Sequence, residues 1–172
     1  MEWHVPLADL DYGVEEEEAV IKVLRSKWLT MGGVTQEFEA AFAAKVHTKH
    51  AFAVSNATEA LHLACMALGI GQGDEVITPS LSFVATSNAV LYTGADVRFA
   101  DISGLDDLTI SPQEIQKKIT PKTKAVMVMH YGGYPCHMPE ILEIAQERGV
   151  AIIEDAAHCP GSSLDGRMLG TW

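Results

Sequence analysis

Two acids follow a short apolar run in the stretch Val150-Ala-Ile-Ile-Glu-Asp-Ala-Ala-His-Cys-Pro160. The run at 150–153 is rich in β-branched residues, which predicts a buried strand. In open α/β sheets, ligands bind beyond the carboxyl ends of the parallel strands. Asp155 and His158 lie at such an end, where they could contact two atoms of one flat ring. The alternative interpretation is that Asp155 only caps the following turn and His158 only fills space.

Apolar runs of this kind alternate with helical patterns from residue 50 onward. Strands are predicted at 51–54, 75–78, 96–100, 125–129 and 150–153. Four helices lie between them, and the one that begins at Ser111-Pro-Gln-Glu114 has a capping serine and a proline at its first position. This alternation predicts an α/β fold with a parallel sheet covered on both faces and right-handed crossovers.

The chain before this point lacks the alternation and is predicted to be a helical lead-in. Its first helix begins in a run of four glutamates, which complement the helix dipole. Val20, Leu24 and Trp28 follow at a spacing of four residues, so we expect them to form a packed stripe. Thr35 is expected to cap a second helix. We therefore expect this lead-in at 1–48 and the α/β domain at 49–172.

The composition excludes several classes of protein. At 172 residues with 48% hydrophobic content, the chain is long enough to bury one core. Its formal net charge of −11 argues against binding to nucleic acid, whose phosphates require basic patches. Three cysteines, an odd number without paired spacing, argue against a disulfide scaffold and fit a cytoplasmic protein. The N-terminus does not resemble a signal peptide, and no apolar run is long enough to span a membrane.

The segment Ser55-Asn-Ala-Thr58 joins the first predicted strand to a helix and is a candidate phosphate site. Free amides at a helix N-terminus, together with the Thr58 hydroxyl, can hold a phosphate. The alternative is that Asn56 or Thr58 only caps the helix. The chain contains neither G-x-G-x-x-G nor G-x-x-x-x-G-K-[ST]. The first absence argues against a Rossmann-type nucleotide or methyl-donor domain, and the second excludes an NTP-cleaving P-loop in its usual form.

Aromatic and sulfur-containing side chains follow other predicted strands. Phe83 comes after the second strand and could stack on a planar ligand, although a lone aromatic is more often part of the core. The loop His130-Tyr-Gly-Gly-Tyr-Pro-Cys-His137 follows the fourth strand and suits a segment that closes over a substrate. The adjacent pairs Cys136-His137 and His158-Cys159 lack the spacing of structural zinc sites, so no metal is expected.

Several motifs, in order along the chain, resemble one known family. The sequence resembles the sugar aminotransferases of the DegT/DnrJ/EryC1/StrS group in the motifs Ser55-Asn-Ala-Thr-Glu-Ala-Leu-His-Leu-Ala64, Gly73-Asp-Glu-Val-Ile-Thr-Pro-Ser80, Phe83-Val-Ala-Thr86, Thr120-Pro-Lys-Thr-Lys-Ala125 and Glu154-Asp-Ala-Ala-His158. The resemblance extends from Pro6 to Trp172. It implies a three-layer, mainly parallel sheet of fold type I with the strand order 3-2-4-5-6-7-1. It also implies pyridoxal 5′-phosphate (PLP) as cofactor, nucleotide-linked keto-sugars as substrates, glutamate as amino donor and a homodimer.

The resemblance assigns roles to five positions. Ala57 and Thr58 match the positions that bind the cofactor phosphate, and Phe83 matches the aromatic that stacks on the pyridine ring. Asp155 matches the catalytic acid that pairs with the ring nitrogen, and His158 matches the position, often glutamine, that contacts the phenolic oxygen. The chemistry agrees, because a carboxylate beside the ring nitrogen favours its protonated form. Protonation makes the ring an electron sink for the carbanion that forms when the substrate loses a proton.

The sequence also departs from the family pattern. Family members are longer, and their Schiff-base lysine follows the Asp-x-x-His motif, whereas every lysine here precedes Asp155. The serine that helps to hold the phosphate and the small C-terminal domain are missing too. We therefore expect an N-terminal half that is inactive alone. Its strand at 51–54 would have no neighbour, so the isolated chain is expected to be marginally stable. Two alternatives stay open: a sugar dehydratase of the same family, or a non-catalytic binding fragment that assembles with another chain.

Overall fold

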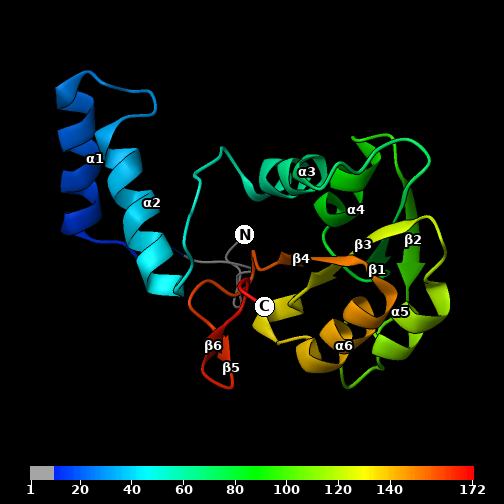
Figure 1. Cartoon of the computed structure of the whole chain (residues 1–172). Helices are drawn as coiled ribbons and strands as arrows, with labels where there is room; N and C mark the ends of the chain where they lie inside the picture. The colour runs from blue at the N-terminus through cyan, green and yellow to red at the C-terminus, as the bar shows by residue number, and fades with distance from the viewer. Residues whose placement is uncertain (1–9) are drawn as a thin grey trace, which may run out of the picture.

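The computed structural model describes residues 10–172. The start of the family resemblance at Pro6 and the segment compared with signal peptides lie outside these residues. Figure 1 shows a sheet between two layers of helices, with a pair of N-terminal helices beside it. Within 10–172, none of the helices combines the length and the apolar character that are needed to cross a bilayer.

Four parallel strands form the central sheet. They are β1 (Glu75–Pro79), β2 (Asp96–Ala100), β3 (Thr123–Met129) and β4 (Ala151–Asp155). Their spatial order is β2-β1-β3-β4, which is the order predicted for the second to fifth strands of the family's sheet. The register pairs Pro79 with Ala100 and Met129 with Asp155, so these strand ends lie level with one another. The predicted α/β class and the order of these strands are therefore confirmed.

Helices cover both faces of this sheet (Figure 1). The helices α3 and α4 lie on one face and α5 and α6 on the other; their bounds are α3 (Ala57–Ala67), α4 (Val84–Leu91), α5 (Pro112–Lys118) and α6 (Met138–Arg148). Successive side chains of a strand point to opposite faces. Val76 and Met127 belong to the core that includes α3 and α4, whereas Ile77 and Val126 belong to the core that includes α5 and α6. The predicted three-layer arrangement is confirmed.

Local sequence sets the ends of several of these helices. Asn56 Oδ1 accepts the N–H of Glu59 at 3.0 Å and caps α3. Ser111 Oγ accepts the N–H of Glu114 at 3.3 Å and caps α5, as predicted. The helix α6 ends at Arg148 and is followed by its C-cap Gly149, whose φ of 65° is a left-handed conformation that glycine adopts at little cost.

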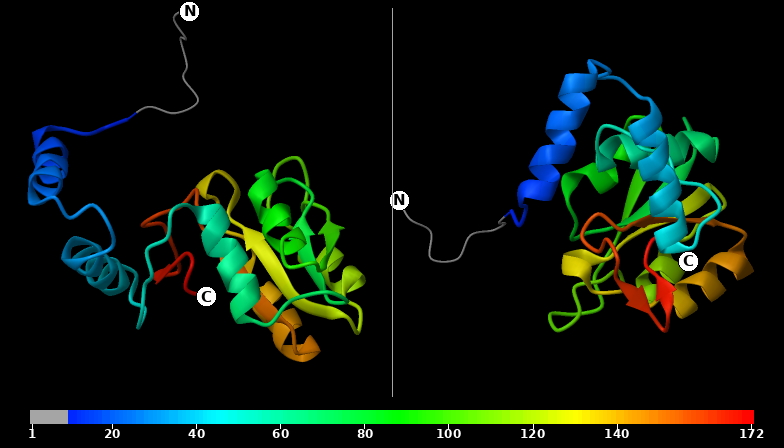
Figure 2. Two further views of the ribbon diagram at one scale, coloured as in Figure 1. Left: turned by 90° about the horizontal axis from the view of Figure 1, so that it is seen from above. Right: turned by 90° about the vertical axis from the view of Figure 1, so that its left-hand side faces the viewer.

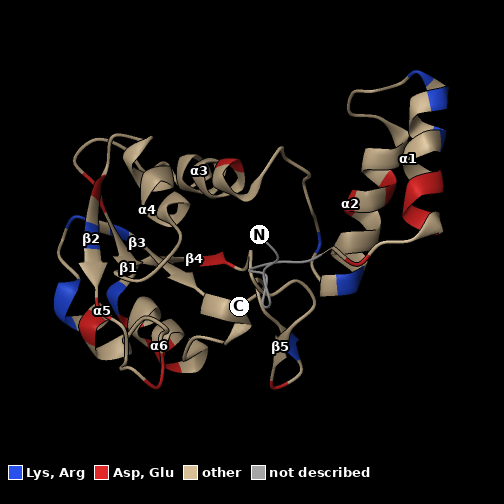
Figure 3. Cartoon of the chain, turned by 180° about the vertical axis from the view of Figure 1, so that it is seen from behind, with Lys and Arg blue, Asp and Glu red and all other residues tan. Residues whose placement is uncertain are grey.

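The N-terminal helices α1 (Val14–Ser26) and α2 (Gly33–Val46) stand apart from the sheet (Figure 2). Acidic residues occupy the first turn of α1, as predicted (Figure 3). The expectation of a packed stripe on this helix is wrong, because Val20, Leu24 and Trp28 are 58–64% exposed. The physical reason is that no second layer covers this face within the described part of the chain, and α1 contains no buried residue.

The helix α2 begins at Gly33 with Gly32 as its N-cap, so the expected cap by Thr35 is wrong. The indole N–H of Trp28 donates to the Met31 carbonyl at 3.2 Å, which folds the ring over the turn. A Cβ at Gly32 would collide with that ring. The ring therefore lies close against Gly32, and the helix starts ahead of Thr35.

The strand predicted at 51–54 does not form. This segment is an irregular connection between α2 and α3, and it pairs with no strand of the described chain. Backbone groups need partners, and here the Ala53 N–H donates instead to Glu39 Oε1 of α2 at 2.8 Å. The prediction of a strand at 51–54 is therefore wrong for this chain. The reason is that a strand needs a neighbouring strand to accept and donate its backbone hydrogen bonds.

A short antiparallel hairpin that was not predicted follows β4. It pairs β5 (Ser163–Leu164) with β6 (Arg167–Met168). Its turn consists of Asp165 and Gly166, whose φ values are 51° and 80°. An Asp-Gly pair favours such two-residue turns because both positions require positive φ. This pair is the sequence signal that could have revealed the hairpin.

Candidate cofactor site

Asp155 ends β4 and is held in one orientation. It is buried, with 5% of its surface exposed. Its Oδ2 accepts the hydroxyl proton of Thr86 at 2.9 Å, and its Oδ1 accepts the N–H of Ala157 at 3.2 Å. An ionised carboxylate accepts hydrogen bonds at both oxygens and keeps further lone pairs for a ligand. Asp155 therefore caps the following turn, as the alternative interpretation predicted, and can still serve as an acceptor at the edge of the sheet.

Phe83 and Thr86 lie one turn apart at the start of α4. Phe83 is the N-cap, and its carbonyl accepts the N–H of Thr86 at 3.1 Å. Thr86 is fully buried beside Asp155, whereas Phe83 is 63% exposed. Phe83 is therefore not part of the core, and its ring is free to stack on a planar ligand. Sequence reasoning missed Thr86, although a hydroxyl one turn after an aromatic at a strand end is a usable signal.

The start of α3 offers backbone donors. Asn56 caps the helix by accepting the N–H of Glu59, which confirms one interpretation of this segment. The amides of Ala57 and Thr58 belong to the first turn, where a helix supplies no carbonyl partner. The cap and the phosphate interpretation are thus compatible. The first turn of α3 and the carboxyl end of β4 lie on the same side of the molecule (Figure 1).

His158 is exposed and is oriented by the loop after β3. Its Nδ1 accepts the N–H of Gly132 at 3.2 Å, and its ring meets Tyr131 edge-on with 6.1 Å between the ring centroids. A Cβ at Gly133 would lie 3.2 Å from the His158 carbonyl oxygen. The absence of a side chain at Gly133 therefore lets this loop lie close to the backbone of His158. The Nε2 of His158 has no hydrogen-bond partner within residues 10–172.

Sequence reasoning missed a buried pair at the same edge of the sheet. His130 Nε2 lies 3.1 Å from Glu154 Oε2, and both side chains are almost fully buried. Glu154 and Asp155 are neighbours on β4, so their side chains point to opposite faces. The signal was present in the sequence, because two consecutive acids at a strand end cannot both face one ligand. One of them needs a partner on the other face.

The four cysteine and histidine positions considered for a metal do not form a cluster. The thiols of Cys136 and Cys159 donate to the carbonyls of Met129 and Ala156. No group of three side chains suited to a metal ion occurs in the described part of the chain. These cysteines therefore have structural contacts that local sequence does not indicate.

A cavity of about 470 Å³ is lined by the loop after β2 and the loop after β3. Tyr131, Tyr134 and Asp107 are among its lining residues, and Asp107 Oδ2 lies 2.8 Å from His137 Nε2. Burial works to raise the pKa of Asp107, but hydrogen bonds from Thr109 and His137 outweigh it and lower that pKa. An ionised carboxylate and two tyrosines thus border one space.

Comparisons with known proteins identify the family and the fold. The sequence profile of the DegT/DnrJ/EryC1/StrS aminotransferase family matches residues 11–172. The spore coat polysaccharide biosynthesis protein SpsC of Bacillus subtilis (strain 168) is 46% identical over 159 residues, which are 92% of this chain and 41% of SpsC. DesV of S. venezuelae, solved in complex with a ketimine intermediate, is 39% identical with a TM-score of 0.88, over 92% of this chain and 42% of DesV. GDP-4-keto-6-deoxymannose-3-dehydratase, solved with a trapped PLP-glutamate geminal diamine, is 29% identical with a TM-score of 0.90, over 97% of this chain and 45% of the dehydratase.

The fold, the strand-end carboxylate and these likenesses define the class of PLP-dependent enzymes with the aminotransferase fold. The chain belongs to the DegT/DnrJ/EryC1/StrS aminotransferase family, whose cofactor is PLP. It spans 41–45% of the length of these relatives. The residues fit that cofactor, because a fixed buried carboxylate, an exposed aromatic and first-turn amides suit a ring nitrogen, a ring face and a phosphate.

Proposed function

We propose that this chain supplies the cofactor-binding half of an aminotransferase that acts on a nucleotide-linked keto-sugar, with glutamate as the amino donor. Asp155 carries the proposal, since it is a buried carboxylate whose two oxygens are fixed by Thr86 and Ala157 at a strand end. Two relatives support the substrate and the donor. SpsC is named for polysaccharide biosynthesis, and the dehydratase was solved with PLP and glutamate joined.

Asp155 is the proposed catalytic residue. When PLP is bound, it supplies an electron sink for the carbanion that substrate deprotonation leaves. The sink requires a protonated ring nitrogen, and a carboxylate beside that nitrogen stabilises the proton. The hydrogen bonds from Thr86 and Ala157 hold the carboxylate in place, so it acts without reorganising during the reaction.

Four other residues are proposed to hold the ring and its phosphate. The amides of Ala57 and Thr58 would bind the phosphate at the start of α3, where the helix dipole adds about 0.3–2 kcal/mol. Phe83 would stack on the pyridine ring and contribute about 0.5–1.5 kcal/mol beyond area burial. His158 would donate from Nε2 to the phenolic oxygen, because its Nδ1 already accepts the N–H of Gly132.

The cavity bordered by Tyr131, Tyr134 and Asp107 is proposed to lie on the sugar side. Tyrosine rings offer apolar faces and polar tips, and the Asp107 carboxylate is an acceptor for hydroxyl groups. The cavity adjoins the cofactor residues through Tyr131, whose ring contacts His158. A sugar held there would therefore reach the ring that His158 orients.

We assign residues 1–48 to a helical lead-in and residues 49–172 to part of a PLP-binding large domain. Every lysine of this sequence precedes Asp155, and none stands at the family's Schiff-base position. These residues alone would then bind the cofactor without a covalent bond and would not complete transamination. The complete site is proposed to form in a cytoplasmic homodimer, without a nucleic-acid or membrane partner.

Titration with pyridoxamine 5′-phosphate (PMP) tests the proposal, because its amine forms no Schiff base with lysines. We expect saturable binding in the fluorescence of the cofactor. Asp155→Asn keeps the shape of the side chain but removes its charge, so the affinity should fall by about tenfold or more. Asp165→Asn, in the exposed hairpin turn, is the matched control and should leave the affinity unchanged. Absence of saturation, or equal losses in the two variants, would refute the proposal.

A sugar dehydratase of the same family is a second candidate, because GDP-4-keto-6-deoxymannose-3-dehydratase shares the fold of this chain with a TM-score of 0.90. By the family resemblance, it would have a histidine where an aminotransferase has its Schiff-base lysine. The whole protein would then bind PLP without the absorbance shift that a lysine adduct produces. A non-catalytic fragment would show that shift only after mixing with the chain that completes it.

A further inference from the structure

We propose that His130 is a positioning residue that orients His158 through the turn Tyr131–Gly133, and that Glu154 keeps the ring proton of His130 on Nε2 so that Nδ1 can accept the Cys136 N–H. The inference rests on the proposed function, in which His158 contacts the phenolic oxygen of PLP. Its parts are a buried histidine–glutamate pair, a turn that contains two glycines, and one hydrogen bond from that turn to His158.

The ring proton of His130 is assigned by its two partners. Nδ1 accepts the backbone N–H of Cys136 at 3.1 Å, so this nitrogen holds a lone pair. A neutral imidazole has one donor and one acceptor nitrogen, and Nε2 therefore donates to Glu154 Oε2 at 3.1 Å. The His130 side chain has no exposed surface, so water cannot replace either partner.

Glu154 accepts two further hydrogen bonds from the end of the described chain. Its Oε2 accepts the N–H of Gly170 at 2.8 Å, and its Oε1 accepts the N–H of Trp172 at 2.6 Å. Three N–H donors therefore surround one carboxylate, which fixes its orientation. The partner of His130 is thus itself held by hydrogen bonds, and the His130 ring is hydrogen-bonded at both nitrogens.

His130 fixes the turn through its backbone as well as its ring. Its carbonyl accepts the N–H of Gly133 at 3.0 Å, and its own N–H donates to the Asp155 carbonyl at 3.2 Å. The ring holds the N–H of Cys136 at the far end of the same loop. Both ends of the loop are therefore tied to one buried residue.

The glycines direct the turn toward His158. Gly132 and Gly133 have φ values of 61° and 87°, a left-handed conformation that costs glycine little. In this conformation the Gly132 N–H donates to His158 Nδ1 at 3.2 Å, which leaves the proton of a neutral His158 on Nε2. A proton on Nε2 is what an oxygen acceptor on the ligand requires. The buried pair thus favours the form of His158 that has its proton on Nε2, the nitrogen that would face the ligand.

The end of β4 would then act on the cofactor ring at two atoms. Asp155 faces one side of the sheet and would contact the ring nitrogen directly. Glu154 faces the other side and would act on the phenolic oxygen through His130, the turn and His158. The two consecutive acids would therefore act on different atoms of the ring.

Two substitutions separate the two nitrogens of His130. In His130→Asn, the carboxamide oxygen takes the place of Nδ1 and can accept the Cys136 N–H, but the donor to Glu154 is lost. In His130→Gln, the longer carboxamide reaches the place of Nε2 and keeps that donor, but the acceptor for Cys136 is lost. A role limited to filling space predicts similar effects for both. His50→Asn and His50→Gln, at an exposed residue, are the matched controls.

The readout is the NMR coupling across the hydrogen bond between the Gly132 amide nitrogen and His158 Nδ1, which needs no cofactor. We expect this coupling in the unsubstituted chain and in His130→Asn, and its loss in His130→Gln. The affinity for PMP should fall about fivefold in His130→Gln, the factor that one net hydrogen bond is worth. It should stay within about twofold in His130→Asn and in both His50 variants.

Equal effects of the two His130 substitutions would overturn the inference. A ring proton on Nδ1 of His130 in the unsubstituted chain would also overturn it, and the same spectra report this without any variant. The proposed function fails differently: the couplings would behave as expected, yet no form of the chain would bind PMP.

Discussion

The α/β body and the N-terminal helix pair both contain large apolar side chains but bury them to very different extents. In the body, Ile77, Met127 and Ile141 have no exposed surface. In the helix pair, Leu24 and Trp28 are 58% and 64% exposed. The difference shows that periodicity predicts a helix and its apolar face, whereas burial of that face requires a second surface.

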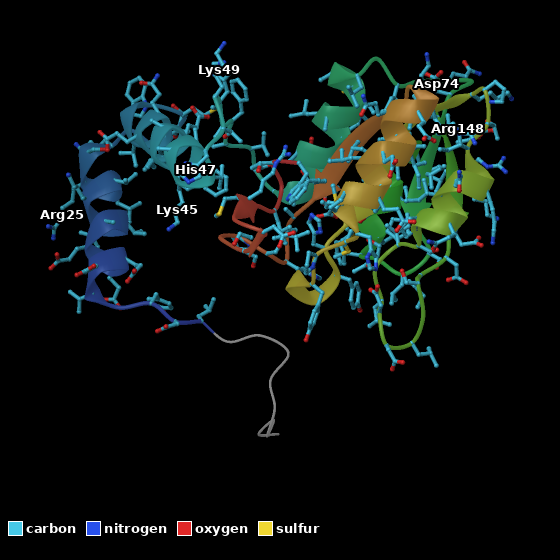
Figure 4. All side chains as sticks on the ribbon, turned by 60° about the horizontal axis from the view of Figure 1, so that its bottom comes forward. Arg25, Lys45, His47, Lys49, Asp74 and Arg148 are labelled. Carbon is cyan, nitrogen blue, oxygen red and sulfur yellow. The ribbon has the colours of Figure 1, made fainter. Side chains whose placement is uncertain are left out.

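The arrangement of the chain explains the difference. Figure 4 places Arg25 of α1 well apart from Asp74 and Arg148 of the body. The sheet covers the apolar faces of the helices α3 to α6, which pack on its two sides. The helix α1 packs against no such surface within the described residues. Stability should therefore come mainly from the body, and substitutions in the two regions can test this.

The largest effect is expected from Ile77→Ala in the centre of the sheet. Ile77 lies on β1 and is fully buried in the core that includes α5 and α6, so the substitution leaves a cavity. The free energy of unfolding should fall by about 2–5 kcal/mol. Urea denaturation followed by circular dichroism measures it, and a loss below about 1 kcal/mol would mean that the body is not the stable unit.

An alkaline loss of stability is expected next, because the cysteines lie in the body. Burial raises the pKa of the Cys136 thiol to about 12 and that of the Cys159 thiol to about 11, both from 9.0. A raised pKa stabilises the folded chain below pH 9, and this contribution is lost as the pH rises through the folded values. Between about pH 9 and 10, the Cys136 contribution should fall by roughly 1 kcal/mol.

Denaturation of Cys136→Ala at the same pH values isolates this contribution. The variant should lose less stability than the unsubstituted chain over that interval, since it lacks the thiol that ionises on unfolding. An identical loss in both proteins would show that the Cys136 thiol does not determine the alkaline limb.

A smaller effect is expected from Thr86→Val, which removes the hydroxyl that donates to Asp155 but keeps the shape of the side chain. The lost hydrogen bond should reduce stability by about 0.5–1.5 kcal/mol and weaken PMP binding about fivefold. Thr30→Val, in the exposed connection between α1 and α2, is the control and should change neither. If PMP affinity is unchanged in Thr86→Val, this hydroxyl does not orient the carboxylate for the cofactor.

The smallest effect is expected from Leu24→Ala in α1. Because Leu24 is largely exposed, the free energy of unfolding should change by no more than about 0.5 kcal/mol. The same denaturation experiment compares it directly with Ile77→Ala. A loss of similar size in both variants would mean that the apolar face of α1 is covered in solution.

The elements that sequence reasoning predicted correctly depend on local signals. The runs that became the central strands β1 and β3 are largely apolar because both faces of the sheet are covered there. Asn56 and Ser111 cap helices with their own side chains, within one turn. Asp155 and His158 were found because a polar residue that directly follows a buried strand lies at the sheet edge.

The elements that sequence reasoning missed depend on partners far away in the chain. The segment at 51–54 has the composition of a strand but no neighbouring strand within residues 10–172. The hydrogen bond from Thr86 to Asp155 and the contact of His130 with Glu154 join residues that the fold brings together. Local signals mark Thr86 and Glu154 as positions of interest, but only the folded arrangement shows which residues they pair with.

A crystal structure of the protein with PMP tests the central claim most directly. We predict an Asp155 carboxylate oxygen at about 2.7–2.9 Å from the pyridine nitrogen, the range of a charge-assisted hydrogen bond. The phosphate of the same ligand should lie on the amides of Ala57 and Thr58. A pyridine nitrogen that faces water or another side chain, or a phosphate bound away from the start of α3, would contradict the claim.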